Sequence, residues 1–329
     1  MKKVYTLASL LLALLFASVL VQAAGAKASN QQGSLRQAVS ATAQSANPTK
    51  FLTACQKGDI KSVLRYLEKN QGKKDFDINM RDKDGNTPLI LASASGHKDV
   101  VNALLQVPGI KIDARRLGTG MTALMYAAAW GHKHVVHVLV KAGAKISIKD
   151  YEGRTAVMLA ASSGQVDIIR ELGSTVYTNR GEQAWRKLVD MQDEKGKTAL
   201  MYACLSGRNT RDYAEPVVAL LDYVANPNIQ DNEGKTALIH ATIDGDIGAV
   251  GALLTQGLMY KADPNIQDNK GKTALMYAAI HGQGKIVSVL LDMGKADATI
   301  KDNEGLVAQD YTADDLIEQM LRLAASKKR

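Results

Sequence analysis

The sequence predicts an all-α solenoid, in which helix-turn-helix units stack on one another and β-turn or hairpin fingers join them. First, a block of the form Gly-x-Thr-(Pro or Ala)-(Leu or Val) recurs at intervals of 33 to 43 residues, with its threonines at Thr87, Thr122, Thr155, Thr198, Thr236 and Thr273. Second, each block ends on a glycine that would terminate a first helix: Gly96, Gly131, Gly164, Gly207, Gly245 and Gly282. Third, an amphipathic stretch such as 134–140 follows and predicts a second helix. Similarity at a fixed period indicates a repeat architecture.

The chemistry of each block supports a helix start. Thr87 has the side chain of a good N-cap, and Pro88 follows at the first helical position, where its missing N–H costs nothing. The other blocks carry alanine there, which favours a helix. Leu124, Ala127 and Ala128 share one face, and paired alanines let neighbouring helices approach closely. Each block therefore predicts a short first helix that packs on its neighbours.

The period near 33 residues, the Thr-Pro-Leu-x-x-Ala core and the Gly-His join between helices resemble the ankyrin repeat. Six copies in register make this resemblance specific, and it covers residues 48 to about 323. It divides residues 48–329 into an N-terminal cap at 48–81, six central repeats at 82–301 and a C-terminal cap at 302–329. The resemblance implies a binding module that presents its turn tips and inner helices to a protein partner.

The N-terminus predicts export. Lys2 and Lys3 precede an apolar run at 4–21, and small residues follow it, which together are typical of a secretory signal peptide at 1–23. The alternative is an uncleaved membrane anchor, because the run is just long enough to cross a bilayer. Residues 24–47 are mostly Ala, Ser, Gln, Asn and Thr, which predicts a flexible linker. The short lysine start and the alanine-rich signal favour a bacterial protein in the periplasm, with secretion as the alternative.

The composition suits a thin, stacked fold and limits the class of partner. Apolar residues make up 46% of the chain but aromatic residues only 5%, so alanine and leucine supply the burial. The net charge of +8 is mild and scattered, whereas nucleic-acid proteins concentrate positive charge on one face. We therefore expect a monomer that binds a protein, with no nucleic acid and no membrane contact beyond the signal peptide. Cys55 and Cys204 hold equivalent positions several repeats apart, so both are expected to be buried and unbridged.

The sequence shows no sign of catalysis. It lacks a nucleophile elbow, a phosphate loop, a dinucleotide fingerprint and a zinc-binding cysteine pattern. The histidines of GHKHVVH (His132, His134 and His137) could suggest a metal site, but His132 fills the Gly-His join and no carboxylate is near in sequence. The turn aspartates recur because the turn recurs, and they are expected to bond local backbone N–H groups. We therefore predict no catalytic residue, no metal and no cofactor, and the chain is not expected to be an enzyme.

Candidate partner-contacting residues fall into three rows and one insertion. Large apolar side chains precede the helix-ending glycines: Trp130, Leu205, Ile243 and Ile280. Tyrosines share one register position: Tyr126, Tyr202 and Tyr277. Lysines precede the block threonine: Lys197, Lys235 and Lys272, which would steer an acidic partner. Additional residues within 170–190 hold Trp185, and insertions in solenoids usually form loops on a working face.

Each candidate has a purely structural alternative. The apolar side chains could pack on the turn of a neighbouring repeat, the tyrosines could be half-buried between inner helices, and the lysines could be a solvated row. The insertion could be drift in a tolerant loop. The leading hypothesis is a scaffold or inhibitor that binds a protein in the periplasm or outside the cell. The alternatives are a secreted effector that binds a host protein and, less favoured, an enzyme with a site in the 170–190 insertion.

Overall fold

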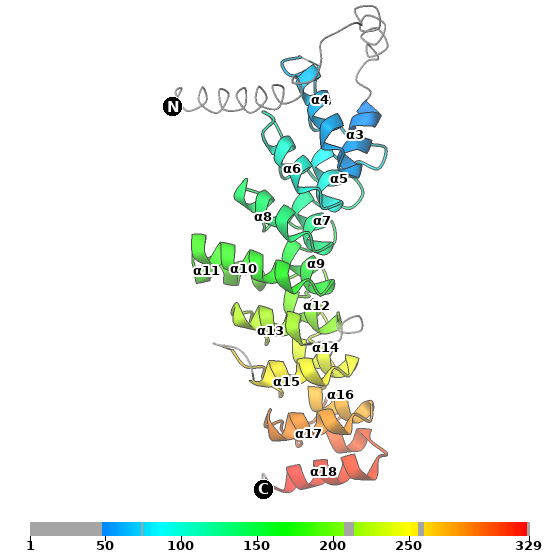
Figure 1. The fold of residues 1–329 in the computed structure, drawn as a ribbon. Helices are drawn as coiled ribbons and strands as arrows, with labels where there is room; N and C mark the ends of the chain where they lie inside the picture. Colours follow the sequence, from blue (N-terminus) through cyan, green and yellow to red (C-terminus); the bar gives the residue numbers. More distant parts are fainter. Residues whose placement is uncertain (1–47, 74, 207–213, 256–259, 328–329) are drawn as a thin grey trace, which may run out of the picture. The chain divides into compact units, whose positions relative to one another are not determined.

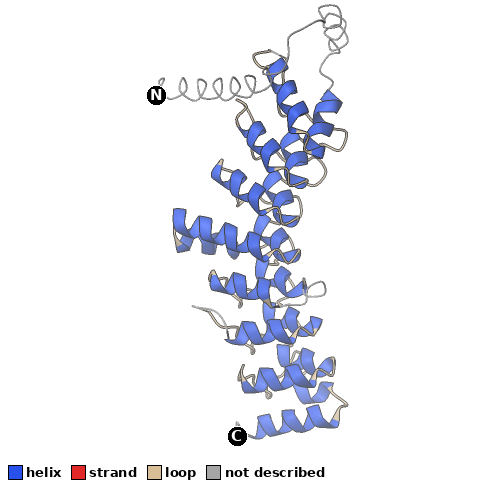
Figure 2. Ribbon diagram, viewed as in Figure 1, coloured by secondary structure: helices blue, strands red, loops and turns tan. Residues whose placement is uncertain are grey.

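The computed structural model describes residues 48–73, 75–206, 214–255 and 260–327, and every regular element in those ranges is a helix (Figure 1, Figure 2). The all-α prediction is confirmed. The signal peptide and linker predicted at 1–23 and 24–47 lie outside these ranges, as do Gly207 and most of the extra residues of the fourth and fifth repeats. Among the described helices, none combines the length and apolar character that a membrane span needs.

Helices come in consecutive pairs, and the two members of each pair belong to two layers. The first helices are α3 (Pro48–Lys57), α5 (Pro88–Ala94), α7 (Ala123–Ala129), α9 (Ala156–Ser162), α12 (Ala199–Leu205), α14 (Ala237–Asp244), α16 (Ala274–Ile280) and the 3-10 helix η2 (Ala308–Tyr311). The second helices are α4 (Ile60–Asn70), α6 (Lys98–Leu105), α8 (Lys133–Lys141), α10 (Val166–Arg180), α13 (Glu215–Asp222), α15 (Ile247–Thr255), α17 (Gly284–Asp292) and α18 (Asp315–Ser326). Within each layer, every helix contacts the next one along the chain (Figure 1).

The repeated threonines begin the first helices as N-caps. The Thr122 hydroxyl accepts a hydrogen bond from the backbone N–H of Met125 at 3.3 Å, and the other five block threonines make the same bond. This satisfies a donor that the helix start would leave unpaired. In the C-terminal cap, Val307 replaces the threonine, and the first helix shrinks to the 3-10 turn η2.

Histidines at the helix join connect neighbouring repeats. His97 Nε2 lies 3.0 Å from the Gln56 carbonyl oxygen, and His132 Nε2 lies 3.0 Å from the Ala94 carbonyl oxygen, one repeat earlier in each case. The His97 ring fills the space beside Gly58, where a Cβ would lie 2.5 Å from the ring. These two histidines are therefore structural, as the Gly-His join predicts.

The core is one continuous cluster of buried side chains that runs from Phe51 in α3 to Leu321 in α18. Cys55 and Cys204 are both fully buried in it, as predicted, and burial raises the pKa of the Cys55 thiol to about 12. Helices α5, α7 and α9 stand between α3 and α12, so the two sulfur atoms are too far apart for a disulfide within the chain.

The third repeat departs from the pair pattern because its extra residues are helical. Helix α10 runs for 15 residues, and after Gly181, which has φ +80°, the chain reverses into an additional helix α11 (Glu182–Val189). Helix α11 packs on α10, and α10 contacts α13 of the next repeat. The expected surface loop at 170–190 is thus a helical extension of the layer of second helices (Figure 1).

Finger glycines are required because the next finger approaches them closely. Gly234 has φ +78°, and a Cβ on it would lie 2.6 Å from the backbone nitrogen of Asn269. We expect Gly234→Ala to lower the free energy of unfolding by about 1–3 kcal/mol, because it combines a strained φ with a clash. Gly251, inside α15 with open space around it, is the matched control: Gly251→Ala should raise stability by about 0.5–1 kcal/mol. Urea denaturation of both variants measures this, and equal effects would contradict it.

Candidate functional site

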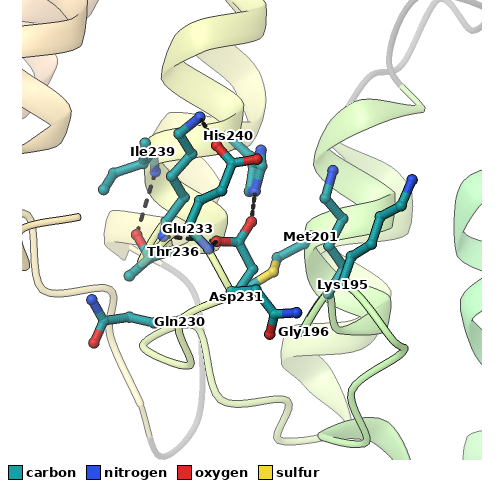
Figure 3. A network of polar contacts seen from close by, with 12 residues as sticks. Lys195, Gly196, Met201, Gln230, Asp231, Glu233, Thr236, Ile239 and His240 are labelled. Carbon is teal, nitrogen blue, oxygen red and sulfur yellow. Dashed lines mark hydrogen bonds and ion pairs between the residues drawn. The ribbon is translucent and has the colours of Figure 1, made fainter. Parts of the chain in front are cut away.

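Six fingers are each organised by an aspartate, which is buried in all of them except the first, where Asp82 is half-buried. Asp231 Oδ1 accepts hydrogen bonds from the backbone N–H groups of Glu233 and Lys235, both at 2.9 Å (Figure 3). Five other finger aspartates make the same pair of bonds: Asp82, Asp150, Asp193, Asp268 and Asp302. The recurring carboxylates therefore hold the turn, which is the structural role that their repetition indicates.

In four of these fingers the second oxygen of the aspartate binds a side chain from the first helix. The Tyr202 hydroxyl donates to Asp193 Oδ2 at 2.7 Å, and the Tyr277 hydroxyl donates to Asp268 Oδ2 at 2.7 Å. Burial and this bond raise the pKa of both hydroxyls. Two of the three candidate tyrosines are thus half-buried with their hydroxyls bound inside the chain, so the structural alternative holds for them.

The lysine row is also largely engaged within the chain. Lys235 Nζ lies 2.7 Å from Glu233 Oε2 and 5.9 Å from the centre of the Tyr277 ring. Lys272 Nζ lies 3.4 Å from Asp302 Oδ2 and 3.8 Å from the Tyr311 ring centre. Lys197 forms no ion pair with a described residue. The row therefore offers less positive charge to a partner than the sequence pattern suggests.

Exposed apolar side chains remain at the C-terminal ends of the first helices. Trp130 is 65% exposed after α7, Leu205 37% at the end of α12, and Ile280 41% at the end of α16. Ile243, at the same position of α14, is half-buried. We call Trp130, Leu205, Ile243 and Ile280 the helix-end row. It lies on the second, fourth, fifth and sixth repeats, and three of its four side chains are exposed.

Two exposed apolar side chains at the finger tips were not singled out from the sequence. Leu117 is 58% exposed and Tyr151 54% exposed, in the second and third fingers. The corresponding tips of later fingers carry polar residues such as Asn232 and Asn269. The contrast between apolar tips in these two fingers and polar tips in the later ones could have identified Leu117 and Tyr151 from the sequence.

Comparison with known proteins agrees with this geometry. The family model described as "Ankyrin repeats (3 copies)" matches residues 20–116, 51–150, 112–180, 152–214 and 209–302. The chain belongs to the ankyrin-repeat family. The fold is similar to the crystal structure of the ankyrin repeat domain of Bcl-3, a member of the IkappaB protein family. The superposition covers 73% of this chain and 100% of the Bcl-3 chain, with a TM-score of 0.62 and 27% sequence identity.

Two curated relatives are similar over part of the array. The "NF-kappa-B inhibitor cactus" of Drosophila melanogaster is 42% identical over 123 residues, which is 37% of this chain and 25% of cactus. "Ankyrin repeat domain-containing protein 46" of Mus musculus is 36% identical over 156 residues, which is 46% of this chain and 63% of the mouse protein. The matched part of this chain thus spans 25% of the length of cactus and 63% of the length of the mouse protein.

The position of Trp185 in this ankyrin-repeat protein corrects the expectation that it contacts a partner. Trp185 is 0% exposed, and its Nε1 donates to the Tyr223 carbonyl oxygen at 2.8 Å. The two rings meet edge to face with centroids 6.0 Å apart, and Gly173 leaves room for the Tyr223 ring. Helix α11 therefore braces the third repeat against the fourth, because its largest apolar side chain is needed to fill that contact.

The polar residues around Trp185 also serve the brace. Arg186 pairs with Glu182 at 2.5 Å, and its guanidinium lies 5.7 Å from the Tyr260 ring centre, in the extra residues of the fifth repeat. Asp190 Oδ1 accepts from the backbone N–H of Asn226 at 2.9 Å. Each of these contacts joins α11 to itself or to a neighbouring repeat, which is a structural use of the polar residues in the 170–190 insertion.

The histidine motif GHKHVVH is divided between separate contacts. His132 bonds the Ala94 carbonyl, whereas His137 Nδ1 lies 2.7 Å from Glu171 Oε1 in α10. The sequence missed Glu171 because it is one repeat away. Among the described residues, no three His, Cys, Asp or Glu side chains are grouped as metal ligands would be.

His240 predicts a pH-dependent stability. Its Nε2 lies 2.7 Å from Asp231 Oδ2 (Figure 3), and its pKa is below the ordinary 6.5, chiefly because burial disfavours the charged ring, while the bond to Asp231 opposes the shift. As the pH falls, the His240 ring therefore takes up a proton at a higher pH in the unfolded chain than in the folded one. The stability that the neutral, buried ring contributes is present above pH 6.5 and is lost as the pH falls toward the folded pKa.

We expect His240→Tyr to remove this loss, because Tyr202 and Tyr277 make the same bond to their aspartates without titrating. Urea unfolding of both proteins at pH 7.5 and 5.5 measures it, and the drop should be smaller in the variant. A wild-type protein that gains stability relative to the variant at pH 5.5 would contradict the neutral His240.

Trp185→Ala should lower the free energy of unfolding by about 3–5 kcal/mol, because it leaves a cavity and an unpaired Tyr223 carbonyl. Trp130→Ala is the matched control and should change stability by about 0.5 kcal/mol or less, since its ring is mostly in solvent. Denaturation midpoints compare the two, and similar losses would show that Trp185 is not a brace.

Proposed function

We propose that this ankyrin-repeat protein is a scaffold or inhibitor that binds a partner protein through the helix-end row after export to the periplasm or the cell exterior. The observation that carries the proposal is the exposure of Trp130, Leu205 and Ile280 on three different repeats. Large apolar and aromatic side chains left in solvent along one row are typical of an interaction surface. Relatives support the class of function, because cactus is named as an inhibitor of NF-kappa-B.

Most of the candidate tyrosines and lysines are bonded within the chain, which favours the helix-end row as the binding surface. The hydroxyls of Tyr202 and Tyr277 and the ammonium groups of Lys235 and Lys272 already have partners within the chain. Recruiting them would cost the bonds that hold the fingers, whereas the helix-end row can bury apolar surface without breaking a contact. A secreted effector that binds a host protein remains the second form of this proposal, since it would use the same row in another location.

The test compares pull-downs from the exported fraction with wild type and with the double variant Trp130→Ala, Ile280→Ala. We expect the variant to lose partner affinity by about tenfold or more, because central apolar anchors contribute most of the binding energy. Leu316→Ala, Leu323→Ala in α18 is the matched control, since both side chains are similarly exposed but lie off the row. Its binding should equal that of wild type.

Equal recovery of every partner by all three proteins would contradict the helix-end row. The same cultures test location: the chain should leave the cytoplasm with its N-terminus near residue 24. Recovery in the medium would favour the effector, and retention after export would favour the periplasmic scaffold or inhibitor.

A further inference from the structure

The second finger differs from the others in charge. Arg116 occupies the place of the buried aspartate, and its backbone N–H donates to the Met121 carbonyl at 2.8 Å, just as the N–H of Asp150 donates to Arg154 at 2.9 Å. Residues 115–121 read RRLGTGM, so the tip of this finger contains no carboxylate. A cation therefore stands where its neighbours place an anion.

This exchange reverses the hydrogen bond to the tyrosine of the first helix. Arg116 Nη1 donates to the Tyr126 hydroxyl oxygen at 3.2 Å, and Arg116 Nε donates to the Asp84 carbonyl oxygen at 3.3 Å. In the fourth and sixth repeats the tyrosine hydroxyl donates to an aspartate. Tyr126 accepts instead, and no described group accepts its proton. The hydroxyl is therefore poised to donate to an external acceptor.

The positive charge of this finger is not neutralised by a described residue. Arg115 donates through Nε to the Gly120 carbonyl at 3.0 Å and lies 5.0 Å from the centre of the Tyr151 ring. Neither Arg115 nor Arg116 forms an ion pair within the described ranges, whereas Arg154, Lys235 and Lys272 each do. The two guanidinium groups thus retain charge and unused donors.

Exposed apolar side chains flank this pair of arginines. Leu117 is exposed at the tip of the same finger, and Trp130, the C-cap of α7, is exposed four residues after Tyr126. The second repeat therefore carries an exposed apolar tip, a guanidinium bound to a tyrosine hydroxyl, and the exposed indole of the helix-end row. We call Arg116, Leu117, Tyr126 and Trp130 the second-repeat strip.

We propose that the second-repeat strip binds an acidic segment of the partner protein, with a carboxylate of that segment on Arg116 and Tyr126 and apolar residues beside it on Leu117 and Trp130. This inference rests on the proposed function, because it names the chemistry of the same partner. A guanidinium and a hydroxyl donor suit the two oxygens of a carboxylate. Charge-assisted bonds of this kind fix register and specificity.

The neighbouring fingers favour a short acidic segment over a nucleic acid. Asp82 and Asp84 lie in the first finger, and Asp150 and Glu152 lie in the third. A nucleic acid following the fingers would pass these carboxylates, and two arginines provide little of the extended phosphate contact on which such binding depends. A single carboxylate between apolar contacts needs only the second finger.

The probe is a fluorescein-labelled ten-residue peptide of Glu, Asp and Leu, together with its Gln, Asn and Leu counterpart. We expect wild type to bind the acidic peptide at least tenfold more tightly in fluorescence anisotropy, with an affinity that falls as salt rises. Arg116→Asp should abolish this preference while keeping the fold, because it restores the aspartate–tyrosine pair of the other fingers. Tyr126→Phe should weaken binding severalfold by removing the free hydroxyl.

Lys270→Asp is the matched control, since it makes the same charge change at an exposed tip that retains its aspartate, Asp268. It should leave peptide binding within about twofold of wild type. Equal binding of both peptides by wild type, or an equal loss in Lys270→Asp, would overturn the proposal. Tighter, Arg116-dependent binding of a twelve-nucleotide single-stranded DNA would also overturn it, in favour of a nucleic-acid site.

The pull-down separates this inference from the proposed function. A partner that is lost with Trp130→Ala, Ile280→Ala but retained by Arg116→Asp would overturn the acidic-segment proposal alone. If every variant instead recovers all the partners that wild type recovers, the helix-end row is overturned, whatever the peptides show.

Discussion

The aspartate carboxylate at the base of six of the fingers is the interaction on which the rest of the array depends. One oxygen closes the turn by accepting two backbone N–H groups. The other oxygen binds a tyrosine or a histidine of the first helix, or, in the third finger, Arg154 of the finger itself. Without water or these donors, a buried anion would be strongly destabilising. In the fingers where that side chain comes from the first helix, the position of the finger relative to its helix pair therefore follows from satisfying one charge.

Contacts between fingers extend this local arrangement along the chain. The Gln230 side-chain amide donates to the Gly234 carbonyl of its own finger at 2.8 Å and to the Gln267 carbonyl of the next at 2.9 Å. Asn269 approaches Gly234 so closely that only glycine fits there. Each repeat thus supplies hydrogen-bond partners for the next, as expected of units that are individually too small to be stable.

Internal bonding also decides which surfaces are left for a partner. Side chains that could donate hydrogen bonds to a partner, such as Tyr277, Lys272 and His240, are already bonded to the finger aspartates. What remains is apolar side chains at helix ends and, in the second repeat, an arginine pair without carboxylates. The extension α10–α11 adds stiffness across the third to fifth repeats, since Trp185 and Arg186 each contact a different repeat.

The sequence by itself determined the repeat period, the helix pairs, the threonine caps and the burial of the cysteines, because these depend on interactions within a few residues or on a pattern repeated six times. It also indicated the exposed helix ends at Trp130 and Ile280. Only the tertiary structure decided that Trp185 is buried, that Lys272 is paired and that Arg116 faces Tyr126 without a carboxylate. Trp185 and Lys272 meet partners in other repeats, 38 residues away for Tyr223 and 39 for Tyr311. Arg116 takes the aspartate position in a finger that is one residue longer, since its N–H bonds the carbonyl five residues on and the N–H of Asp150 bonds the carbonyl four residues on. Local pattern cannot report such exposure and pairing, because they arise only when one repeat is laid against the next.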